Sequence, residues 1–250
     1  MKSTFLLFVS LSLLVRAVSG FAPSNSIIYH DDFTTVQPEW NLSLTQTQNN
    51  TQAISASYAS VNNGYLRLKA NVGSGWDYLF ANAALDLMLP DEFVINYRAR
   101  KSQWAGHFSL SLTDVFVSDY EMQNYLQILY YKEHGHWRDP IRFSNFENNA
   151  FSNNYSLAIT DSAGYFNYGI WHDYKFIKSD EGISLEIDNV LVLESNFTDF
   201  EGNFLTFSAI EAGSTVDIDY LTITTVPEPS TYAILLGGTV LGYAFWQRRK

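Results

Sequence analysis

The chain has 250 residues, with 26 acidic and 15 basic side chains, a formal net charge of −11 and no cysteine. An acidic chain lacks the cationic patches that nucleic acids require, so no nucleic-acid partner is expected. The absence of cysteine excludes disulfides, thiol nucleophiles and cysteine-based zinc sites.

The first twenty residues have the layout of a secretory signal peptide. A short basic start, Met1-Lys2, precedes an apolar run over 5–15 and then the small residues Ala17 to Gly20. Such a segment directs export and is removed by signal peptidase. We therefore predict a signal peptide over 1–20 and an exported domain over 21–225, with Arg16 leaving the position of the cut open.

The interval 21–225 contains many stretches in which apolar and polar residues alternate, the pattern of half-buried strands. The clearest are 65–70, 93–99, 107–112, 125–131, 155–159, 172–178, 183–187, 190–193, 204–208 and 216–223. No convincing amphipathic helix interrupts them. The pattern predicts a single all-β domain with two packed antiparallel sheets. Asp188-Asn189 is predicted to form a two-residue hairpin turn, because both residue types tolerate positive φ.

Several segments resemble, in order, pieces of one known fold. They are Asp31-Asp32-Phe33, 63–68, 171–176, the hairpin over 185–192 and the closing segment 217–223. Together they resemble the concanavalin A-like, or laminin-G-like, jelly rolls of exported bacterial proteins. The resemblance implies a two-sheet antiparallel jelly-roll sandwich. Such folds carry lectins, glycosidases, adhesion modules and inert spacers, so the fold does not decide the activity.

The C-terminal segment 226–250 has three parts in a fixed order. Val226, Pro227, Glu228, Pro229 and Ser230 come first, an apolar stretch over 232–246 follows, and Arg248, Arg249 and Lys250 form a basic end. Fifteen residues make a helix of roughly 22 Å, shorter than the ~30 Å hydrocarbon core, so we predict a short, transient transmembrane helix with the basic residues in the cytoplasm. A buried core helix is the alternative.

This order of motif, apolar helix and basic end resembles the PEP-CTERM sorting signal of Gram-negative bacteria. The resemblance implies that an exosortase of the inner membrane recognises Pro227-Glu228-Pro229. The precursor would then reside in the inner membrane, and the processed protein at the cell surface or in the extracellular matrix. Signal peptidase and exosortase are the partners expected during processing.

The sequence can be searched for a known catalytic motif. Retaining glycoside hydrolases of this jelly-roll class use a Glu-x-Asp-x-x-Glu strand, since alternate residues share a face and can place two carboxylates about 5 Å apart. The nearest match begins at Glu186 and Asp188, but Leu191 occupies the position of the second glutamate. We expect Glu186 and Asp188 to be exposed polar residues flanking the hairpin, and no enzymatic activity. Carboxylates converging from other strands are the alternative.

Four aspartates are candidate calcium ligands. Asp31 and Asp32 near the first strand would approach Asp217 and Asp219 near the last if the terminal strands pair, and hard cations prefer carboxylate oxygens. A solvated acidic surface is the alternative. No other cofactor is expected, because His134 and His136 lack a third zinc ligand.

Three tryptophans are candidate platforms for sugars. Trp76, Trp104 and Trp137 lie in or beside predicted loops, where an exposed ring can stack on a sugar face. Packing in the core or at its rim is the alternative. Altogether the sequence predicts an exported, non-catalytic protein of the envelope or the extracellular polysaccharide matrix, such as a biofilm. A carbohydrate-binding module or a glycoside hydrolase on the same scaffold is the alternative.

Overall fold

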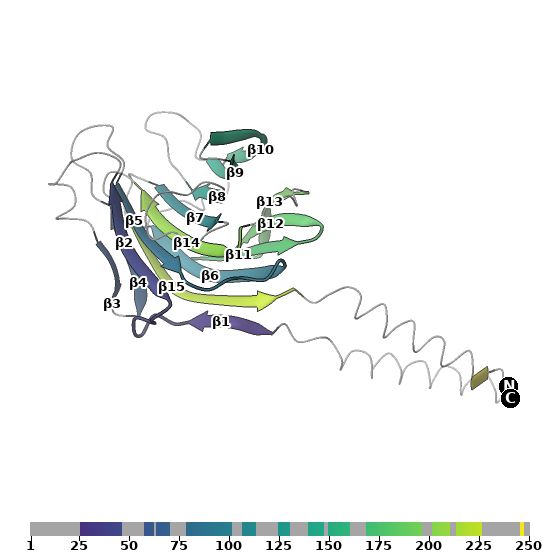
Figure 1. Ribbon diagram of the computed structural model, residues 1–250, viewed down its shortest axis with the longest axis horizontal. Coiled ribbons are helices and arrows are strands. Elements are labelled where there is room, and N and C mark those ends of the chain that lie inside the picture. Colours follow the sequence, from purple (N-terminus) through teal and green to yellow (C-terminus); the bar gives the residue numbers. More distant parts are fainter. Residues whose placement is uncertain are drawn as a thin grey trace. The chain divides into compact units, whose positions relative to one another are not determined.

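The fold was analysed in a computed structural model (Figure 1). The structure describes residues 26–46, 58–62, 64–70, 79–101, 107–113, 125–130, 140–147, 150–160, 169–196, 202–210, 214–226 and 246–247. By its internal contacts, Ile27–Thr225 forms one compact unit. The predicted signal peptide and most of segment 226–250 lie outside the described residues. Among the described residues, no helix is both long enough and apolar enough to span a bilayer.

The described part of the unit Ile27–Thr225 contains fifteen strands. They are β1 (Ile27–Asp31), β2 (Trp40–Gln46), β3 (Tyr58–Asn62), β4 (Tyr65–Ala70), β5 (Leu79–Leu85), β6 (Phe93–Lys101), β7 (His107–Thr113), β8 (Tyr125–Tyr130), β9 (Pro140–Glu147), β10 (Ala150–Thr160), β11 (His172–Ser179), β12 (Gly182–Ile187), β13 (Val190–Ser195), β14 (Phe204–Ile210) and β15 (Ser214–Thr225). Each of the ten segments predicted from alternation is a strand. The prediction lacked β1, β2, β3, β5 and β9.

The strands form two antiparallel sheets, which confirms the predicted two-sheet sandwich (Figure 1). Sheet A has the order β13-β12-β11-β6-β15-β4-β3, and β1 pairs with β15 outside this path. Sheet B has the order β10-β9-β8-β7-β14-β5-β2. Neighbouring strands are often distant in sequence, as in the pairs β15·β6 and β14·β7. Such crossovers are characteristic of jelly rolls rather than of simple meanders.

The core lies between the sheets and is filled by the apolar residues of the alternating strands. Tyr97 of β6 in sheet A is fully buried and meets Phe207 of β14 in sheet B edge to face, with ring centroids 5.1 Å apart. Tyr97 also stacks on Tyr174 of β11 at 4.9 Å. Truncating such a buried aromatic residue to alanine lowers the free energy of unfolding by about 3–5 kcal/mol. The aromatic residues therefore tie the two sheets together.

The turn between β12 and β13 confirms the hairpin prediction. Asp188 and Asn189 have φ values of +52° and +65°, as the two central residues of a type I′ turn require.

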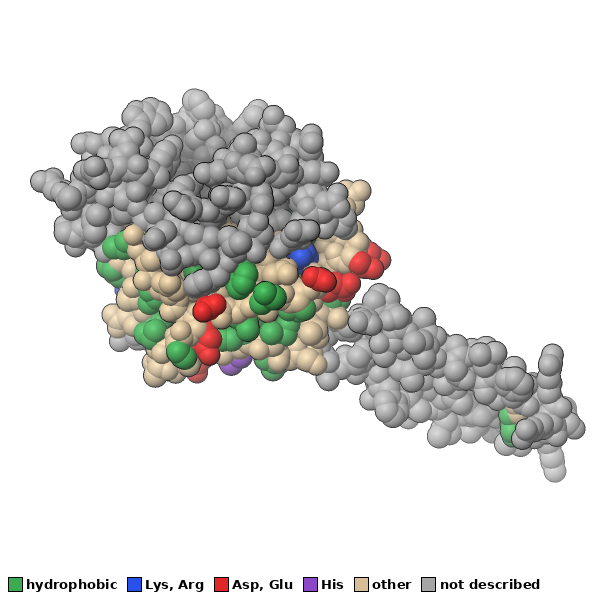
Figure 2. Space-filling view, viewed as in Figure 1, with side chains coloured by type: hydrophobic (Ala, Val, Ile, Leu, Met, Phe, Trp, Pro, Cys, Tyr) green, Lys and Arg blue, Asp and Glu red, His purple; other side chains and the backbone are tan. Residues whose placement is uncertain are grey.

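On the face drawn in Figure 2, acidic side chains are more prominent than basic ones, in keeping with the negative net charge.

Candidate functional site

The middle of the outward face of sheet B carries a group of small polar side chains. In β7, Phe108, Leu110 and Leu112 belong to the core, so Ser109 and Ser111 occupy the opposite face of the strand. The same alternation places polar residues on the outward face of β14 and β5. We call this set the polar floor: Asn82, Ser109, Ser111, Thr113, Thr206 and Ser208.

Strand register aligns the polar floor into rows. Ser109 of β7 pairs with Ser208 of β14, which in turn pairs with Asn82 of β5. In the next row, Ser111 pairs with Thr206. The first row crosses three adjacent strands in the middle of the sheet and the second crosses two, so hydroxyl and amide groups of neighbouring strands lie next to one another.

Two hydroxyls of the polar floor are unsatisfied. All six residues of the floor are buried, and Ser208 Oγ donates a 2.8 Å hydrogen bond to Asn82 Oδ1. Within the part of the chain that the structure describes, Ser109 Oγ and Ser111 Oγ have no hydrogen-bond partner. A buried hydroxyl without a partner costs about 1–3 kcal/mol. A ligand hydroxyl that reached these two serines would recover that free energy.

In β2, β5, β14 and β7, no outward position whose side chain the structure describes carries a carboxylate. These positions are Asn41, Ser43, Asn82, Ala84, Phe204, Thr206, Ser208, Ser109, Ser111 and Thr113. The described outward side chains of these four strands therefore place no carboxylate over the polar floor.

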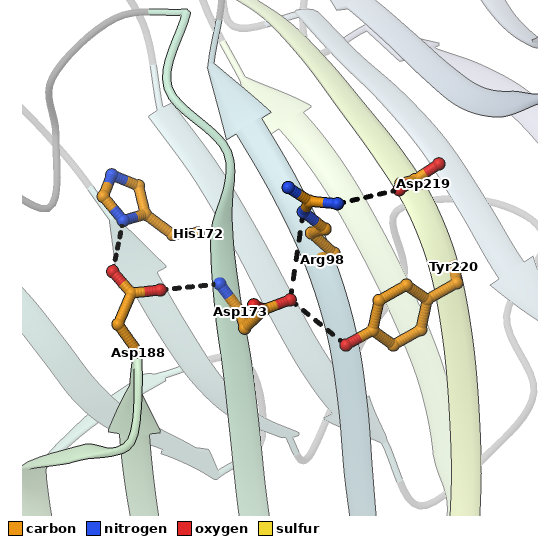
Figure 3. Close-up of polar contacts among 6 residues, drawn as sticks. All are labelled: Arg98, His172, Asp173, Asp188, Asp219 and Tyr220. Carbon is orange, nitrogen blue, oxygen red and sulfur yellow. Dashed lines mark hydrogen bonds and ion pairs between the residues drawn. The ribbon is translucent and has the colours of Figure 1, made fainter.

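Sheet A carries a charged network on its outward face (Figure 3). Arg98 of β6 lies between two strands, with Nε 3.9 Å from Asp173 Oδ1 on β11 and Nη1 3.6 Å from Asp219 Oδ2 on β15. Tyr220 donates a 3.2 Å hydrogen bond to Asp173 Oδ1. Burial and the Asp173 carboxylate raise the pKa of Tyr220, so its phenol stays protonated as a donor.

Asp188 connects the β12–β13 turn to the beginning of β11. Its carboxylate accepts a 3.0 Å hydrogen bond from the Asp173 backbone N–H and lies 2.7 Å from His172 Nδ1 (Figure 3). Burial disfavours the Asp188 anion, but these hydrogen bonds outweigh burial and lower the pKa of Asp188. The Asp188 N–H also donates to the Asp173 carbonyl oxygen at 2.8 Å. These contacts fix the turn, which is a structural role.

Other charged side chains on the outward face of sheet A also form ion pairs with one another. Asp217 is almost completely buried and accepts hydrogen bonds from Arg67 at 2.5 and 2.8 Å and from Arg100 at 3.0 Å. The Arg100 guanidinium also lies 4.5 Å from the ring centroid of Trp171, and Arg98 lies 5.6 Å from it. These contacts join β4, β15 and β6.

The structure does not bring the four predicted calcium ligands together. β1 and β15 pair as expected, but Asp31 lies opposite Leu221, four residues beyond Asp217. Asp31 is buried and accepts hydrogen bonds from the Trp40 indole and the Phe33 N–H, both at 2.7 Å. Asp32 is exposed, and hydrogen bonds from Thr34 lower its pKa. Among the described residues, no three His, Asp or Glu form a group that could hold a metal ion.

The broken glycosidase motif has the geometry of an ordinary hairpin. Glu186 is half-buried and paired with Lys175 Nζ at 3.0 and 3.2 Å, whereas Asp188 is exposed in the turn. Leu191 is the register partner of Glu186 and is exposed.

The other residues predicted from the sequence to have a role lie outside the described residues: Trp76, Trp104, Trp137, His134, His136, Pro227, Glu228, Pro229, Ser230, Arg248, Arg249 and Lys250. Val226 is described and half-buried.

Comparison with known proteins identifies the C-terminal segment. The model of the PEP-CTERM protein-sorting motif matches residues 225–250. The segment is a PEP-CTERM sorting signal. This confirms the recognition made from Pro227-Glu228-Pro229 and the residues that follow, and it marks an exported protein with a C-terminal sorting signal that anchors in a membrane. No curated protein matches the chain.

Solved structures with the same fold were found for the domain. The catalytic domain LamA of Zobellia galactanivorans aligns with a TM-score of 0.56 and 14% identity over 80% of this chain and 98% of that chain. The Bacillus licheniformis β-glucanase aligns with a TM-score of 0.54 and 11% identity, over 80% of this chain and 98% of that chain. A Bacillus subtilis protein of unknown function with a galectin-like fold aligns with a TM-score of 0.58 and 11% identity, over 81% of this chain and 97% of that chain. At these identities the likeness shows the fold, a concanavalin A-like or glucanase-type jelly roll.

Proposed function

We propose that the protein is a non-catalytic, polysaccharide-binding component of the envelope or extracellular matrix, sorted by an exosortase. The polar floor of sheet B, whose six side chains are buried in the structure, supplies its binding site. The sorting signal supports export and delivery to the cell exterior, where polysaccharide is the abundant polymer. The observation that carries the binding proposal is the pair of buried, unpartnered hydroxyls of Ser109 and Ser111 in the middle of the sheet.

The chemistry of the floor favours a neutral glycan. Its groups are hydroxyls and one amide, which both donate and accept hydrogen bonds, as sugar hydroxyls do. The six side chains of the floor carry no charge that would attract a uronic acid or a sulfated sugar through an ion pair. Register places Ser109, Ser208 and Asn82 side by side across three strands, so a chain of sugars could contact several of them in succession.

The absence of carboxylates from the described outward side chains of β2, β5, β14 and β7 supports binding without cleavage. Glycoside hydrolysis generally requires two carboxylates about 5–5.5 Å apart in retaining enzymes or about 6.5–9.5 Å apart in inverting ones. Ser109, Ser111 and their neighbours cannot supply either role, because a serine hydroxyl is neither a general acid near neutral pH nor the anionic nucleophile of this chemistry. The fold neighbours that are named glucanases guide the choice of glycan for the test.

Binding is tested with the processed protein on immobilised glycans, including β-1,3-glucan, mixed-linkage β-glucan and the host's own extracellular polysaccharide. We expect retention on at least one neutral glycan and no release of reducing ends. Ser111→Trp fills the floor and should abolish retention. Ser184→Trp, at a half-buried outward position of β12 in sheet A, is the control for the added ring and should bind normally. Release of reducing ends would favour the glycoside hydrolase instead, and failure to bind any glycan would leave an inert matrix protein.

Sorting has a separate test. Replacing Pro227-Glu228-Pro229 by three alanines should leave export intact but keep the precursor in the inner membrane with its C-terminal segment uncleaved. Proline residues fix φ and present a rigid motif, which alanines cannot reproduce. Release of a normally shortened protein from this variant would show that the motif is not the recognition element.

A further inference from the structure

The end of β15 adjoins the sorting signal directly. β15 ends at Thr225, which is also the first residue matched by the sorting motif. Only Val226 separates the strand from Pro227. The strand is paired to its end, because Thr225 lies opposite Phe93 of β6 on one side and Thr224 lies opposite Ile27 of β1 on the other. The residues immediately upstream of the motif are thus held in a sheet.

β1 is held firmly at one end and weakly at the other. At its C-terminal end, Asp31 is fixed by the Trp40 indole and the Phe33 N–H, and His30 Nδ1 lies 2.8 Å from Thr222 Oγ1. At its N-terminal end, the register shifts between Ile27 and Tyr29, and Ile27 is 68% exposed. A bulge and an exposed terminal residue favour local opening. The weak end of β1 is the end that covers Thr224.

Many recognition sites bind a peptide as an extended strand, through hydrogen bonds to its backbone N–H and C=O groups. The upstream residues of the sorting signal already use these groups in the sheet. An enzyme that binds them must first displace a neighbouring strand. Of the two neighbours, β6 pairs with nine residues of β15 and is itself paired with β11, whereas β1 pairs with four. Displacement of β1 is therefore the less costly route.

We propose that the end of β15, residues 223–226, is the upstream part of the segment that the exosortase binds, and that the N-terminal end of β1 covers it. Opening of the Ile27–Thr224 pair precedes removal of the C-terminal segment. The proposal rests on the proposed function, because it assumes that the exosortase processes this signal. It adds a recognition segment inside the folded domain to the Pro-Glu-Pro motif.

The pairing can be locked with one disulfide, since the chain has no cysteine of its own. Antiparallel partners have Cα atoms about 4.5 or 5.5 Å apart, within the range of about 4.4–6.8 Å found in disulfides. Ile27→Cys with Thr224→Cys in the full-length precursor gives the lock. Tyr58→Cys with Lys69→Cys, which are partners in the β3–β4 pair, gives a matched lock away from the sorting signal.

Each precursor is incubated with membrane vesicles containing the exosortase, and loss of the C-terminal segment is followed by mass. The oxidised Ile27–Thr224 lock should be processed at least about tenfold more slowly than its reduced form, because the locked pair cannot open. The oxidised Tyr58–Lys69 lock should match its reduced form. Equal rates for the oxidised and reduced Ile27–Thr224 variants would overturn the proposal.

A spacer gives a second, independent measurement. Six residues, Gly-Ser three times, inserted after Thr225 provide an extended upstream segment that needs no strand opening. The insertion should speed processing of the otherwise unchanged precursor and restore it in the oxidised lock. An unchanged rate would contradict the proposal even if the disulfide failed to form. If the triple-alanine variant is processed normally, the proposed sorting itself fails, which is a separate outcome.

Discussion

The indole N–H of Trp40 donates a 2.7 Å hydrogen bond to the carboxylate of Asp31, and both side chains are almost completely buried. Asp31 ends β1 and Trp40 begins β2, so this contact joins a strand of sheet A to a strand of sheet B. The hydroxyl of Tyr29 donates to the same carboxylate at 3.1 Å. Burial and the nearby Asp31 charge raise the pKa of Tyr29, so its phenol remains a donor.

Asp31→Asn should therefore be strongly destabilising. The asparagine amide presents N–H donors to groups that are themselves donors, so one or two hydrogen bonds to a charged acceptor are lost, at about 1.5–3 kcal/mol each. We expect a loss of about 2–4 kcal/mol in the free energy of unfolding, measured by urea denaturation. Asp32→Asn, at the exposed neighbouring position, is the control and should change stability little. Equal effects of the two substitutions would contradict a central role for Asp31.

Calcium at the four aspartates predicts a clear thermal signature. If calcium bound only the native state, a hundredfold excess over its dissociation constant would raise the free energy of unfolding by about 2.7 kcal/mol. In a domain of this size that raises the melting temperature by roughly 5–11 °C. Because Asp217 already has two guanidinium partners and Asp31 has three donors, we expect melting in millimolar calcium and in chelator to coincide. A shift that disappears in Asp219→Asn would instead establish the site.

The Asp188 carboxylate should make stability depend on pH in a defined direction. Its pKa is lowered from the ordinary 3.8 in the folded protein, so its contribution is present above that value and is lost as pH falls through the folded pKa. The His172 imidazole and, farther away, the Arg98 guanidinium face it. Asp188→Asn keeps a residue that tolerates positive φ in the turn. The variant removes the charge alone.

The comparison is made between Asp188→Asn and the unchanged protein. The gap between their urea midpoints should be largest at pH 7 and should narrow below about pH 4, where the aspartate becomes protonated. The carboxylate is 43% exposed, so solvent screens the interaction and the gap will be modest. A gap of the same size at pH 7 and pH 3 would mean that the Asp188 charge is irrelevant to stability.

The strength of alternation explains which strands the sequence could predict. β6 and β15 carry large apolar residues at alternate positions and were predicted. The sequence does not predict β5, because two of its core positions, Ala81 and Ala83, are small and give no strong apolar signal. β9 begins with Pro140, which resembles a turn signal.

The candidate sites depended on pairing that local pattern cannot give. The alternation of Ser109 and Ser111 was visible, but their alignment with Ser208 and Thr206 requires two strands about a hundred residues apart to be neighbours. The terminal strands do pair, which is the condition that the calcium hypothesis set. Their register does not follow from the sequence pattern, and an irregularity between Ile218 and Tyr220 sets which outward residues of β15 face β6. Cross-strand arginines then determine the partners of Asp217.

The glycine that begins β12 should tolerate no side chain. Gly182 has φ of +137°, and a Cβ there would meet the Ser195 carbonyl oxygen and lie 2.8 Å from Asn196 Cα. Both are backbone atoms at the end of the neighbouring strand β13. Because Ser195 is paired with Ile183, these atoms cannot move aside without disturbing the sheet. Gly64 has φ of +77° but no atom within 4 Å of its Cβ position. The two glycines thus separate the effect of backbone conformation from that of a steric clash.

Alanine at each position should give losses of different size. Gly64→Ala should lower the free energy of unfolding by about 1–2 kcal/mol, the usual strain of an alanine in the left-handed region. Gly182→Ala adds the clash with β13 and should cost about 2–4 kcal/mol, with displacement of the β12–β13 edge. Urea denaturation of both variants measures the difference. Equal losses would show that β13 can yield at Ser195, and that only the positive φ requires glycine there.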